Sequence, residues 1–325
     1  MLARRAFVAG ALGVLARSRV VEAQPARVYQ VGVVIQGGSA YYLAVDGLRD
    51  GLRELGLEDG KQLVLHVRDA KGDLKAVEVA ARGLEAEHVD LIYSWSTSTS
   101  LAVMRATKKV PIVFYAGSDP VASGLVPNFR KPGGRITGTH GWTTDLTAKR
   151  LELLKEMIPK LRRVVTYYNP ENPAAQQAVK LARGAARQLK VELVEHRVAS
   201  VEELRTSLSA LRPGEADAYL ALSDAMLTSQ AALVIETTTV KRIPTMFQDR
   251  QTVVLGGLAS YGVDYYAVGR FSATQVQRVL LGANPGDLPV VQIERIPFVV
   301  NKKTAKALGL AIPPSVVARA DEILE

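Results

Sequence analysis

Hydrophobic and polar positions along this chain form a repeating order of short apolar runs and longer amphipathic segments. Apolar runs over 28–36, 62–69, 91–96 and 111–117 predict buried β-strands. Between them, apolar residues recur every three or four positions over 42–55 and 74–87, which predicts helices with one buried face. Such alternation is typical of parallel strands that are joined by right-handed helical crossovers.

The same order begins again near residue 145. Its elements are expected as helices over 145–158, 174–189, 201–211 and 228–240, and as strands over 163–168, 191–198, 218–222 and 245–248. The two halves share this architecture without a clear sequence repeat. We therefore expect an α/β protein with two doubly wound, Rossmann-like lobes. Their parallel strands would end at a shared cleft, which is where ligands bind in such sheets.

The stretch 91–100 changes abruptly from an apolar, β-prone run into the hydroxyl residues Ser96 to Ser100. Ser and Thr accept hydrogen bonds from the free N–H groups of a first helical turn, so this run predicts a helix start directly after a strand. The N-terminus of that helix would carry free N–H donors and a positive dipole, which suit a carboxylate or a phosphate. The alternative is that the hydroxyls only cap the helix.

Composition narrows the possible chemistry. A chain of 325 residues can form two domains, and the absence of cysteine excludes disulfides, thiolate metal sites and a cysteine nucleophile. No dinucleotide or phosphate-loop glycine motif occurs, the four histidines lack a metal-ligand spacing, and no Gly-x-Ser-x-Gly is present. Basic residues are scattered rather than clustered with aromatic ones, which argues against nucleic-acid binding. We expect no cofactor, no metal and no enzyme activity.

Residues 1–23 have the features of an export signal peptide. Arg4 and Arg5 precede an apolar stretch over 6–16, and Val21-Glu22-Ala23 forms a small-x-small cleavage pattern. The paired arginines resemble a twin-arginine signal, and a Sec signal fits nearly as well. We expect a periplasmic protein that is not lipidated, because it has no cysteine. The alternative is an amphipathic or disordered leader on a cytoplasmic protein.

Several motifs after residue 110 together resemble one family of ABC-transporter substrate-binding proteins. They are Pro111-Ile112-Val113-Phe114, Asp119-Pro120-Val121, the run from Arg130 to Gly138, Tyr168-Asn169-Pro170, the run from Gly257 to Gly262, and Lys303 to Leu310. Relatives in this family include tryptophan- and phenylalanine-binding proteins with the type 1 periplasmic-binding fold. One departure is Ser94-Trp95-Ser96-Thr97, where relatives commonly carry a smaller turn.

This resemblance implies a three-segment hinge and a two-part site. The crossings would lie near 141–143, 255–260 and 288–293, so that lobe 1 contains residues 28–141 and 261–287 and lobe 2 contains residues 142–260 and 293–325. By family resemblance, a small-molecule ligand would bind between the lobes, and the resemblance implies an amino acid, with an aromatic or a branched side chain as options. The partners would be an ABC permease and, indirectly, its ATPase subunits, with only peripheral contact to the membrane complex.

Candidate ligand-binding residues are polar residues at expected strand ends or near a hinge: Gln36, Ser39, Ser96, Thr97, Ser118, Asp119, Tyr168, Asn169, Ser223, Asp224, Tyr261 and Asp264. The helix start could hold a carboxylate and a facing Asp an ammonium group. The aromatic residues Tyr41, Trp95, Tyr115, Trp142 and Tyr261 could enclose an apolar body. A periplasmic solute receptor is the function we expect, and the alternatives are a ligand-sensing protein or a cleft enzyme on the same fold.

Overall fold

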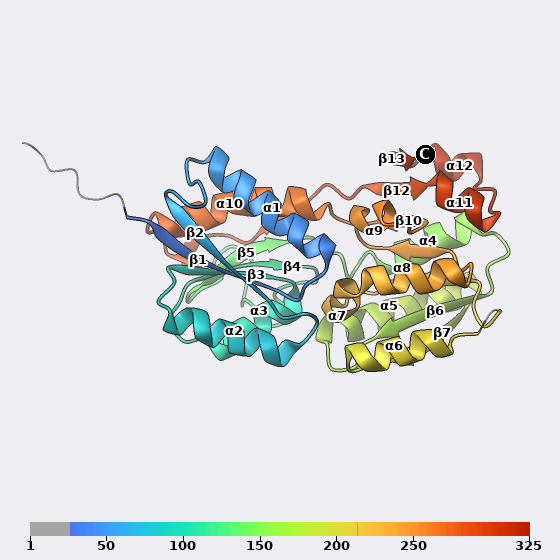
Figure 1. The fold of residues 1–325 in the computed structure, drawn as a ribbon, viewed down its shortest axis with the longest axis horizontal. Coiled ribbons are helices and arrows are strands. Elements are labelled where there is room, and N and C mark those ends of the chain that lie inside the picture. The colour runs from blue at the N-terminus through green and yellow to red at the C-terminus, as the bar shows by residue number, and fades with distance from the viewer. Residues whose placement is uncertain (1–26, 213) are drawn as a thin grey trace, which may run out of the picture.

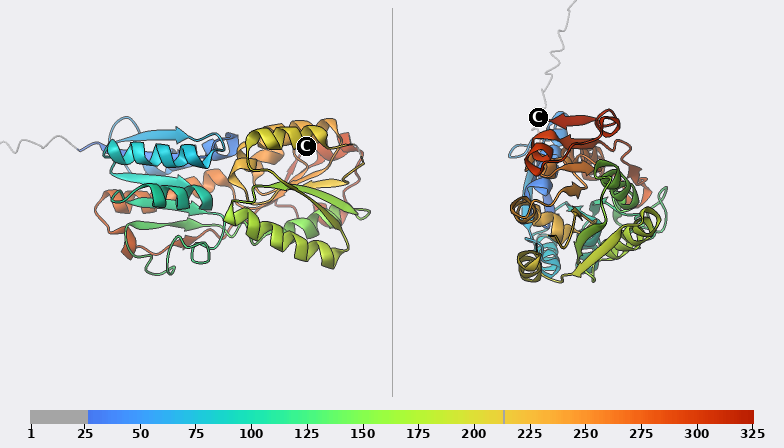
Figure 2. Two further views of the ribbon diagram at one scale, coloured as in Figure 1. Left: turned by 90° about the horizontal axis from the view of Figure 1, so that it is seen from below. Right: turned by 90° about the vertical axis from the view of Figure 1, so that its right-hand side faces the viewer.

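The computed structural model describes residues 27–212 and 214–325, so the expected signal peptide lies outside the described residues. The chain forms two α/β lobes that lie side by side along the longest axis of the molecule (Figures 1 and 2). Each lobe is built around its own β-sheet, one with six strands and one with seven. The predicted fold class is confirmed.

The lobe 1 sheet has the strand order β11-β5-β4-β3-β1-β2, and all of its pairings are parallel. Its strands are β1 (Tyr29–Ile35), β2 (Leu63–Asp69), β3 (Leu91–Trp95), β4 (Ile112–Ala116), β5 (Ile136–His140) and β11 (Val291–Gln292). The four strands that the sequence predicts in this lobe are confirmed within two residues at each end. β5 and β11 were not predicted.

Helices cover both faces of this sheet, and the alternation of side chains along the strands decides what each face contacts. Their bounds are α1 (Ser39–Glu54), α2 (Leu74–Ala86), α3 (Thr97–Ala106) and α10 (Tyr265–Leu280), with a short 3-10 turn η1 (Pro285–Asp287). In β3, Tyr93 and Trp95 pack in the cluster with α1 and α10, whereas Ile92 packs in the cluster with α2 and α3.

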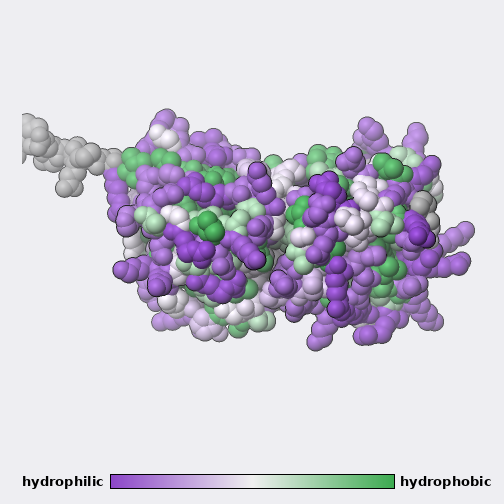
Figure 3. Space-filling model, turned by 60° about the horizontal axis from the view of Figure 1, so that its bottom comes forward, coloured by the Kyte–Doolittle hydropathy of each residue, from purple (hydrophilic) through white to green (hydrophobic). Residues whose placement is uncertain are grey.

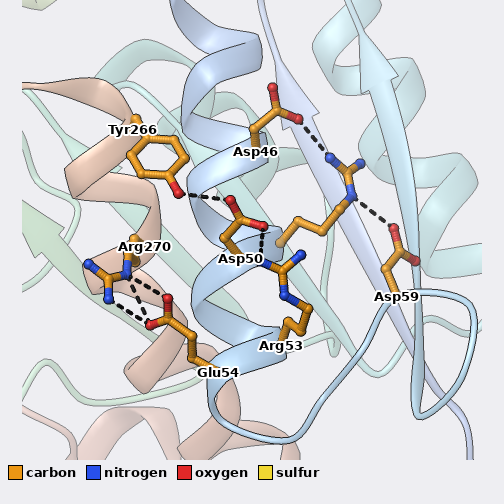
Figure 4. A network of polar contacts seen from close by, with 8 residues as sticks. Asp46, Asp50, Arg53, Glu54, Asp59, Tyr266 and Arg270 are labelled. Carbon is orange, nitrogen blue, oxygen red and sulfur yellow. Dashed lines mark hydrogen bonds and ion pairs between the residues drawn. The ribbon is translucent and has the colours of Figure 1, made fainter.

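α10 is remote from α1 in sequence, yet the two helices pack closely. A Cβ atom at Gly47 would lie 2.0 Å from the carbonyl oxygen of Tyr266, and one at Gly269 would lie 2.0 Å from that of Ala44. Glycine at these positions lets the two backbones approach. Figure 4 shows polar contacts along the same helix pair: the Tyr266 hydroxyl donates to Asp50 (2.7 Å), and Arg270 pairs with Glu54 (2.8 Å).

The lobe 2 sheet has the order β13-β12-β10-β9-β8-β6-β7. Its strands are β6 (Arg163–Tyr168), β7 (Glu192–Arg197), β8 (Ala218–Leu220), β9 (Thr245–Phe247), β10 (Ala259–Tyr261), β12 (Phe298–Asn301) and β13 (Glu322–Leu324). All pairings are parallel except that of β10 with β12. β6 to β9 confirm the predicted strands, and the last three strands were not predicted.

The helices of lobe 2 are α4 (Thr147–Met157), α5 (Pro173–Leu189), α6 (Val201–Ala210), α7 (Ala225–Ser229), α8 (Ala231–Val240), α9 (Arg250–Val254), α11 (Lys302–Leu308) and α12 (Pro314–Val317). The single helix predicted over 228–240 is wrong at its start. Asp224 caps a separate short helix, α7, and Gln230 leaves helical geometry between α7 and α8.

The chain passes between the lobes three times, over 141–146, 262–264 and 293–297. Tyr261, which was expected in lobe 1, lies in β10 of the lobe 2 sheet. The buried guanidinium of Arg150 on α4 donates to the carbonyl oxygens of Thr143 (2.7 Å) and Tyr261 (3.1 Å). This side chain therefore ties the first crossing to the second.

The face of the molecule in Figure 3 is mostly hydrophilic, with small hydrophobic patches on both lobes. Within the described residues, no helix is both long and apolar enough to cross a membrane.

Candidate ligand-binding site

Two adjoining cavities lie between the lobes, at the carboxyl ends of the parallel strands. The inner cavity is small, about 30 Å³, which is room for one or two water molecules. The outer cavity measures about 570 Å³ and has lining residues from both lobes. Ser98 of lobe 1 and Asn172 and Asp224 of lobe 2 line both cavities. The two cavities are therefore parts of one cleft.

The N-terminus of α3 forms the lobe 1 side of the inner cavity. Ser96, Thr97 and Ser98 line it, and the Ser96 hydroxyl caps the helix by accepting from the N–H of Thr99 (3.2 Å). The first two N–H groups of the helix, those of Thr97 and Ser98, have no intrahelical acceptor. Together with the helix dipole they make this end of the cleft a site for an anionic group.

Ser96 has an unusual backbone, with φ 91° and ψ 155°. Only glycine adopts this region easily, and other residues there carry a strain of about 1–3 kcal/mol. The strained turn places the Ser96 hydroxyl at the helix start, 3.3 Å from that of Ser98. Backbone strain of this kind is concentrated at binding and active sites, so it marks the cavity that Ser96 lines as a functional one.

Other hydroxyl groups of the run 94–100 and its surroundings do not line the cavity but support the residues that do. Ser94 and Ser100 bond to each other below the helix start (2.9 Å), and both are fully buried. The Thr97 hydroxyl lies 2.8 Å from that of Ser118, which is buried behind it and does not line the cavity. The Gln36 amide donates to Ser98 (3.3 Å) from the end of β1. These bonds hold the cavity-lining hydroxyls in place.

Asp224 is the acidic group of the lobe 2 side. Its carboxylate accepts from the N–H groups of Asn169 (2.7 Å), Met226 (3.0 Å) and Leu227 (3.4 Å). Burial nevertheless raises the pKa of Asp224 to about 6, because these bonds offset only part of the desolvation. The hydroxyl of the neighbouring Ser223 is buried and has no partner within the described structure. A bound cation would be stabilised here.

Four aromatic rings form the wall of the inner cavity: Tyr41, Trp95, Tyr115 and Tyr265. The ring of Trp95 lies 4.3 Å from that of Tyr115 and 5.2 Å from that of Tyr265, measured between centroids. Trp95 is 1% exposed, and among the described residues its indole N–H has no acceptor. The wall can contact a flat or apolar side chain, and Trp95 offers a free donor.

Seven of the twelve predicted residues line the cleft or lie directly against its lining. Ser96, Thr97, Ser223 and Asp224 line the inner cavity, Gln36 and Asn169 line the outer one, and Ser118 supports Thr97.

Five predicted residues are not brought to the cleft, and their contacts explain why. Ser39 is exposed at the start of α1, and Asp119 closes a turn by accepting from the N–H of Val121 (2.7 Å). The Tyr168 hydroxyl donates to Glu195 (3.2 Å) on the α5 face of the lobe 2 sheet. Tyr261 packs against Phe298, and Asp264 caps α10. Among the predicted aromatic residues, Trp142 packs edge-to-face against His140 and is outside the cavity lining.

Sequence reasoning missed several lining residues: Thr143, Thr144, Asn172, Gln248 and Tyr265. Gln248 ends the predicted strand 245–248, so the strand-end rule could have found it. Asn172 lies in the turn after β6 and caps α5. Tyr265 comes from beyond the second crossing, and no local pattern indicates that α10 brings it to Trp95. Within the described chain, no group of three His, Asp or Glu side chains is placed to hold a metal ion.

Comparison with known proteins identifies a family. A family model described as "ABC transporter substrate binding protein" matches residues 30–324. A tyrosine-binding protein of Clostridioides difficile (strain R20291) is 29% identical over 267 residues, which cover 82% of this chain and 76% of the relative.

Two solved structures resemble this protein over 91% of its chain. A protein from Streptococcus pneumonia in complex with L-Trp is 25% identical, with a TM-score of 0.81 and all of that chain covered. The ligand-free, open structure of a substrate-binding protein with adhesive properties from Clostridium difficile is 27% identical, with a TM-score of 0.61 and 99% of that chain covered. The two identities are nearly equal, and the TM-scores differ.

Proposed function

This chain belongs to the family of ABC transporter substrate-binding proteins, and on that premise we propose that it captures an amino acid between its lobes for import from the periplasm. The observation that carries the proposal is the placement of opposite poles across one cavity. The N-terminus of α3 faces it from lobe 1, and the carboxylate of Asp224 faces it from lobe 2. An α-amino acid is a zwitterion whose two charged groups match these poles.

The aromatic wall supports an aromatic side chain on that amino acid. Tyr41, Trp95, Tyr115 and Tyr265 lie beside the two poles in the same cavity. The solved complex with L-Trp and the tyrosine-binding relative fit this ligand class. A cavity of about 30 Å³ is far below the roughly 300 Å³ of a typical ligand pocket, so the ligand enters with the lobes apart and the rings repack around it.

The likeness to solved structures supports such a motion. At nearly equal identity, the TM-score is higher with the L-Trp complex than with the ligand-free, open structure. We take this difference to reflect the arrangement of the lobes, so that the arrangement described above is the closed one. Closure by hinge motion would bring Asp224 to the ammonium group of a ligand whose carboxylate is already held by α3.

The remaining parts of the proposal concern location and delivery. Residues 1–23 would direct export by the twin-arginine or the Sec route, and the mature protein would remain unlipidated in the periplasm. It would then pass its ligand to an ABC permease whose ATPase subunits act without touching it. The family is one of binding proteins, so we propose no turnover of the ligand.

Titration calorimetry of residues 24–325 with chemically trimmed ligands tests the proposal. L-tryptophan and L-tyrosine should bind with a stoichiometry of one. Tryptamine lacks the carboxylate and indole-3-propionate lacks the ammonium group, so each should bind at least tenfold more weakly than L-tryptophan. Equal affinity of tryptamine would remove α3 from the site, and failure of both amino acids to bind would refute the ligand class. Chromatography of the recovered ligand should show no conversion.

A further inference from the structure

The short helix α7 touches lobe 1 at its far end, outside the inner cavity and beside Gly72, which lines the outer one. A Cβ atom built on Gly38 would lie 2.8 Å from the Cα of Ser229, the last residue of α7. One built on Gly72 would lie 3.1 Å from the Ser229 hydroxyl oxygen and 3.1 Å from a methyl group of Val201. Real Cβ atoms essentially never come within 3.0 Å of such a neighbour. These contacts between the lobes therefore require glycine at position 38 and leave little room at position 72.

The same helix begins at the ligand cavity. Asp224 caps it and lines both cavities, and Ala225 packs in the hydrophobic cluster of lobe 1 with Ala40 and Tyr41. Five residues thus connect the carboxylate that faces the ligand to the contact with Gly38 and Gly72. α7 lies at the junction of the lobes in Figure 1. A displacement of either end must move the other, because the helix is only about one and a half turns long.

We infer that Gly38, Gly72 and Ser229, here called the glycine seam, are positioning residues that let α7 dock on lobe 1 and so bring Asp224 to the ligand. This inference rests on the proposed function, since it describes how the same site completes itself. A side chain at position 38 would hold the lobes apart without touching the ligand. The glycine seam would then set how long the ligand stays bound, because release requires opening, while the first encounter occurs on the open protein.

Substitution with alanine tests the seam, and two other glycines provide matched controls. Gly38 has φ 88° and Gly56 has φ 84°, but a Cβ at Gly56 has no neighbour within 4 Å. Both Gly38→Ala and Gly56→Ala therefore carry the strain of a positive φ, and only the first adds a clash. Gly72→Ala (φ 92°) is paired with Gly282→Ala (φ 99°, no neighbour within 4 Å) in the same way.

Binding kinetics of L-tryptophan and L-tyrosine give the first readout. Overpacking of this kind should raise the dissociation rate by about 10- to 100-fold in Gly38→Ala and leave the association rate within about twofold. Gly56→Ala should match the wild type in both rates. Gly72→Ala should show a smaller increase, because its contacts are longer and end on side chains. Equal rates for Gly38→Ala and Gly56→Ala would overturn the inference while the proposed function stands.

A disulfide trap tests the seam without any ligand. The chain has no cysteine, so the double variant Gly38→Cys/Ser229→Cys contains only the introduced pair. It should form an intramolecular disulfide under mild oxidation, as seen by mass spectrometry, because the two side chains meet as the lobes approach, just short of the full closure that a side chain at position 38 prevents. Gly56→Cys/Ser229→Cys should not. Absence of the disulfide in the first pair would overturn the seam. Its formation in a protein that binds neither amino acid would support the seam and refute the proposed ligand.

Discussion

Ser98 and Asp224 come from different lobes and line both the inner and the outer cavity of the cleft. Ser98 belongs to the first turn of α3, where N–H groups are free, and Asp224 is a buried carboxylate that caps α7. The cleft therefore has a positive pole on one lobe and a negative pole on the other. The following predictions test how each pole, the aromatic wall and the hinge contribute.

The double change Ser96→Ala/Thr97→Ala should weaken binding of L-tryptophan by about 10- to 100-fold. It removes two hydroxyl groups but leaves the helix N–H groups and dipole, so binding should not vanish. Loss of the α3 cap should also lower the free energy of unfolding by about 0.5–2 kcal/mol. Titration calorimetry and a melting curve measure the two effects.

The control is Asp264→Ala, which removes the cap of α10 outside the inner and outer cavities. It should reduce stability by a similar amount and leave affinity unchanged. If the double variant behaves in the same way, the hydroxyls of α3 are only a cap. A loss of affinity in Asp264→Ala would instead restore Asp264 to the site.

Affinity for L-tryptophan should fall as the pH is lowered from 7 to 5. The pKa of Asp224 is raised to about 6 by burial, so its carboxylate is mostly protonated at pH 5 and attracts the ligand's ammonium group less. The expected loss is about tenfold, in proportion to the charged fraction of Asp224.

Calorimetry at several pH values measures this loss of affinity, and Asp224→Asn should bind weakly with no such dependence. Asp249→Asn should retain the dependence, because Asp249 titrates in a similar range but does not line the inner or outer cavity.

The ligand-free protein should show the opposite trend in stability. Since the pKa of Asp224 is higher in the folded state than in the unfolded state, the folded state binds more protons between about pH 4 and 6. The contribution of Asp224 to the free energy of unfolding therefore decreases as the pH rises through this window. The difference between wild type and Asp224→Asn in urea unfolding isolates it. A wild type whose relative stability rises with pH there would contradict the raised pKa.

Trp95→Ala should lower both stability and affinity for aromatic amino acids. The side chain is 1% exposed and contacts three other rings of the wall, so its loss should cost about 3–5 kcal/mol of unfolding free energy. Trp142→Ala is the control, since Trp142 packs on His140 and Phe129 outside the cavity lining. That variant should lose stability and keep its affinity. If both variants bind alike, the wall does not contact the ligand.

Arg150→Met should destabilise the protein by about 2–4 kcal/mol, because it leaves the buried carbonyl groups of Thr143 and Tyr261 without this donor. Arg150→Lys should recover only part of the loss, since an ammonium group lacks the forked donor geometry. The neighbour variant Lys149→Met removes an exposed pair with Glu152 and should change stability by less than about 0.5 kcal/mol. Thermal unfolding compares all three, and equal melting points would exclude a role of Arg150 in tying the crossings.

The mature protein should begin near Gln24. Expression in a bacterial host followed by intact-mass measurement of the periplasmic fraction tests this expectation. Replacing Arg4 and Arg5 by lysine should stop export only if the twin-arginine route is used. A protein that keeps Met1, or one that carries a lipid, would contradict the predicted signal.

The sequence by itself determined the local elements and the class of fold. Alternating apolar runs and amphipathic segments predicted β1 to β4 and β6 to β9, because strand and helix periods are properties of neighbouring residues. The same rule placed Ser96, Thr97 and Asp224 at strand ends that face one cleft. Family motifs such as Asp119-Pro120 indicated the fold. Asp119 itself does not reach the cleft but stabilises a turn by accepting from the N–H of Val121. β10 and β11 have only three and two residues and lie beyond the strand–helix alternation that identified the equally short β8 and β9.

Only the tertiary structure decided which strand-end residues meet. Tyr265 joins Trp95 because glycines on α1 and α10 let two helices more than 200 residues apart pack together. Tyr168 and Tyr261 have the right chemistry at strand ends, but alternation along each strand and packing across the sheet turn them away from the cleft. The glycine seam is equally invisible in sequence, since Gly38, Gly72 and Ser229 become neighbours only when the lobes close. Contacts between distant segments depend on tertiary packing, so they cannot be predicted from the pattern of neighbouring residues.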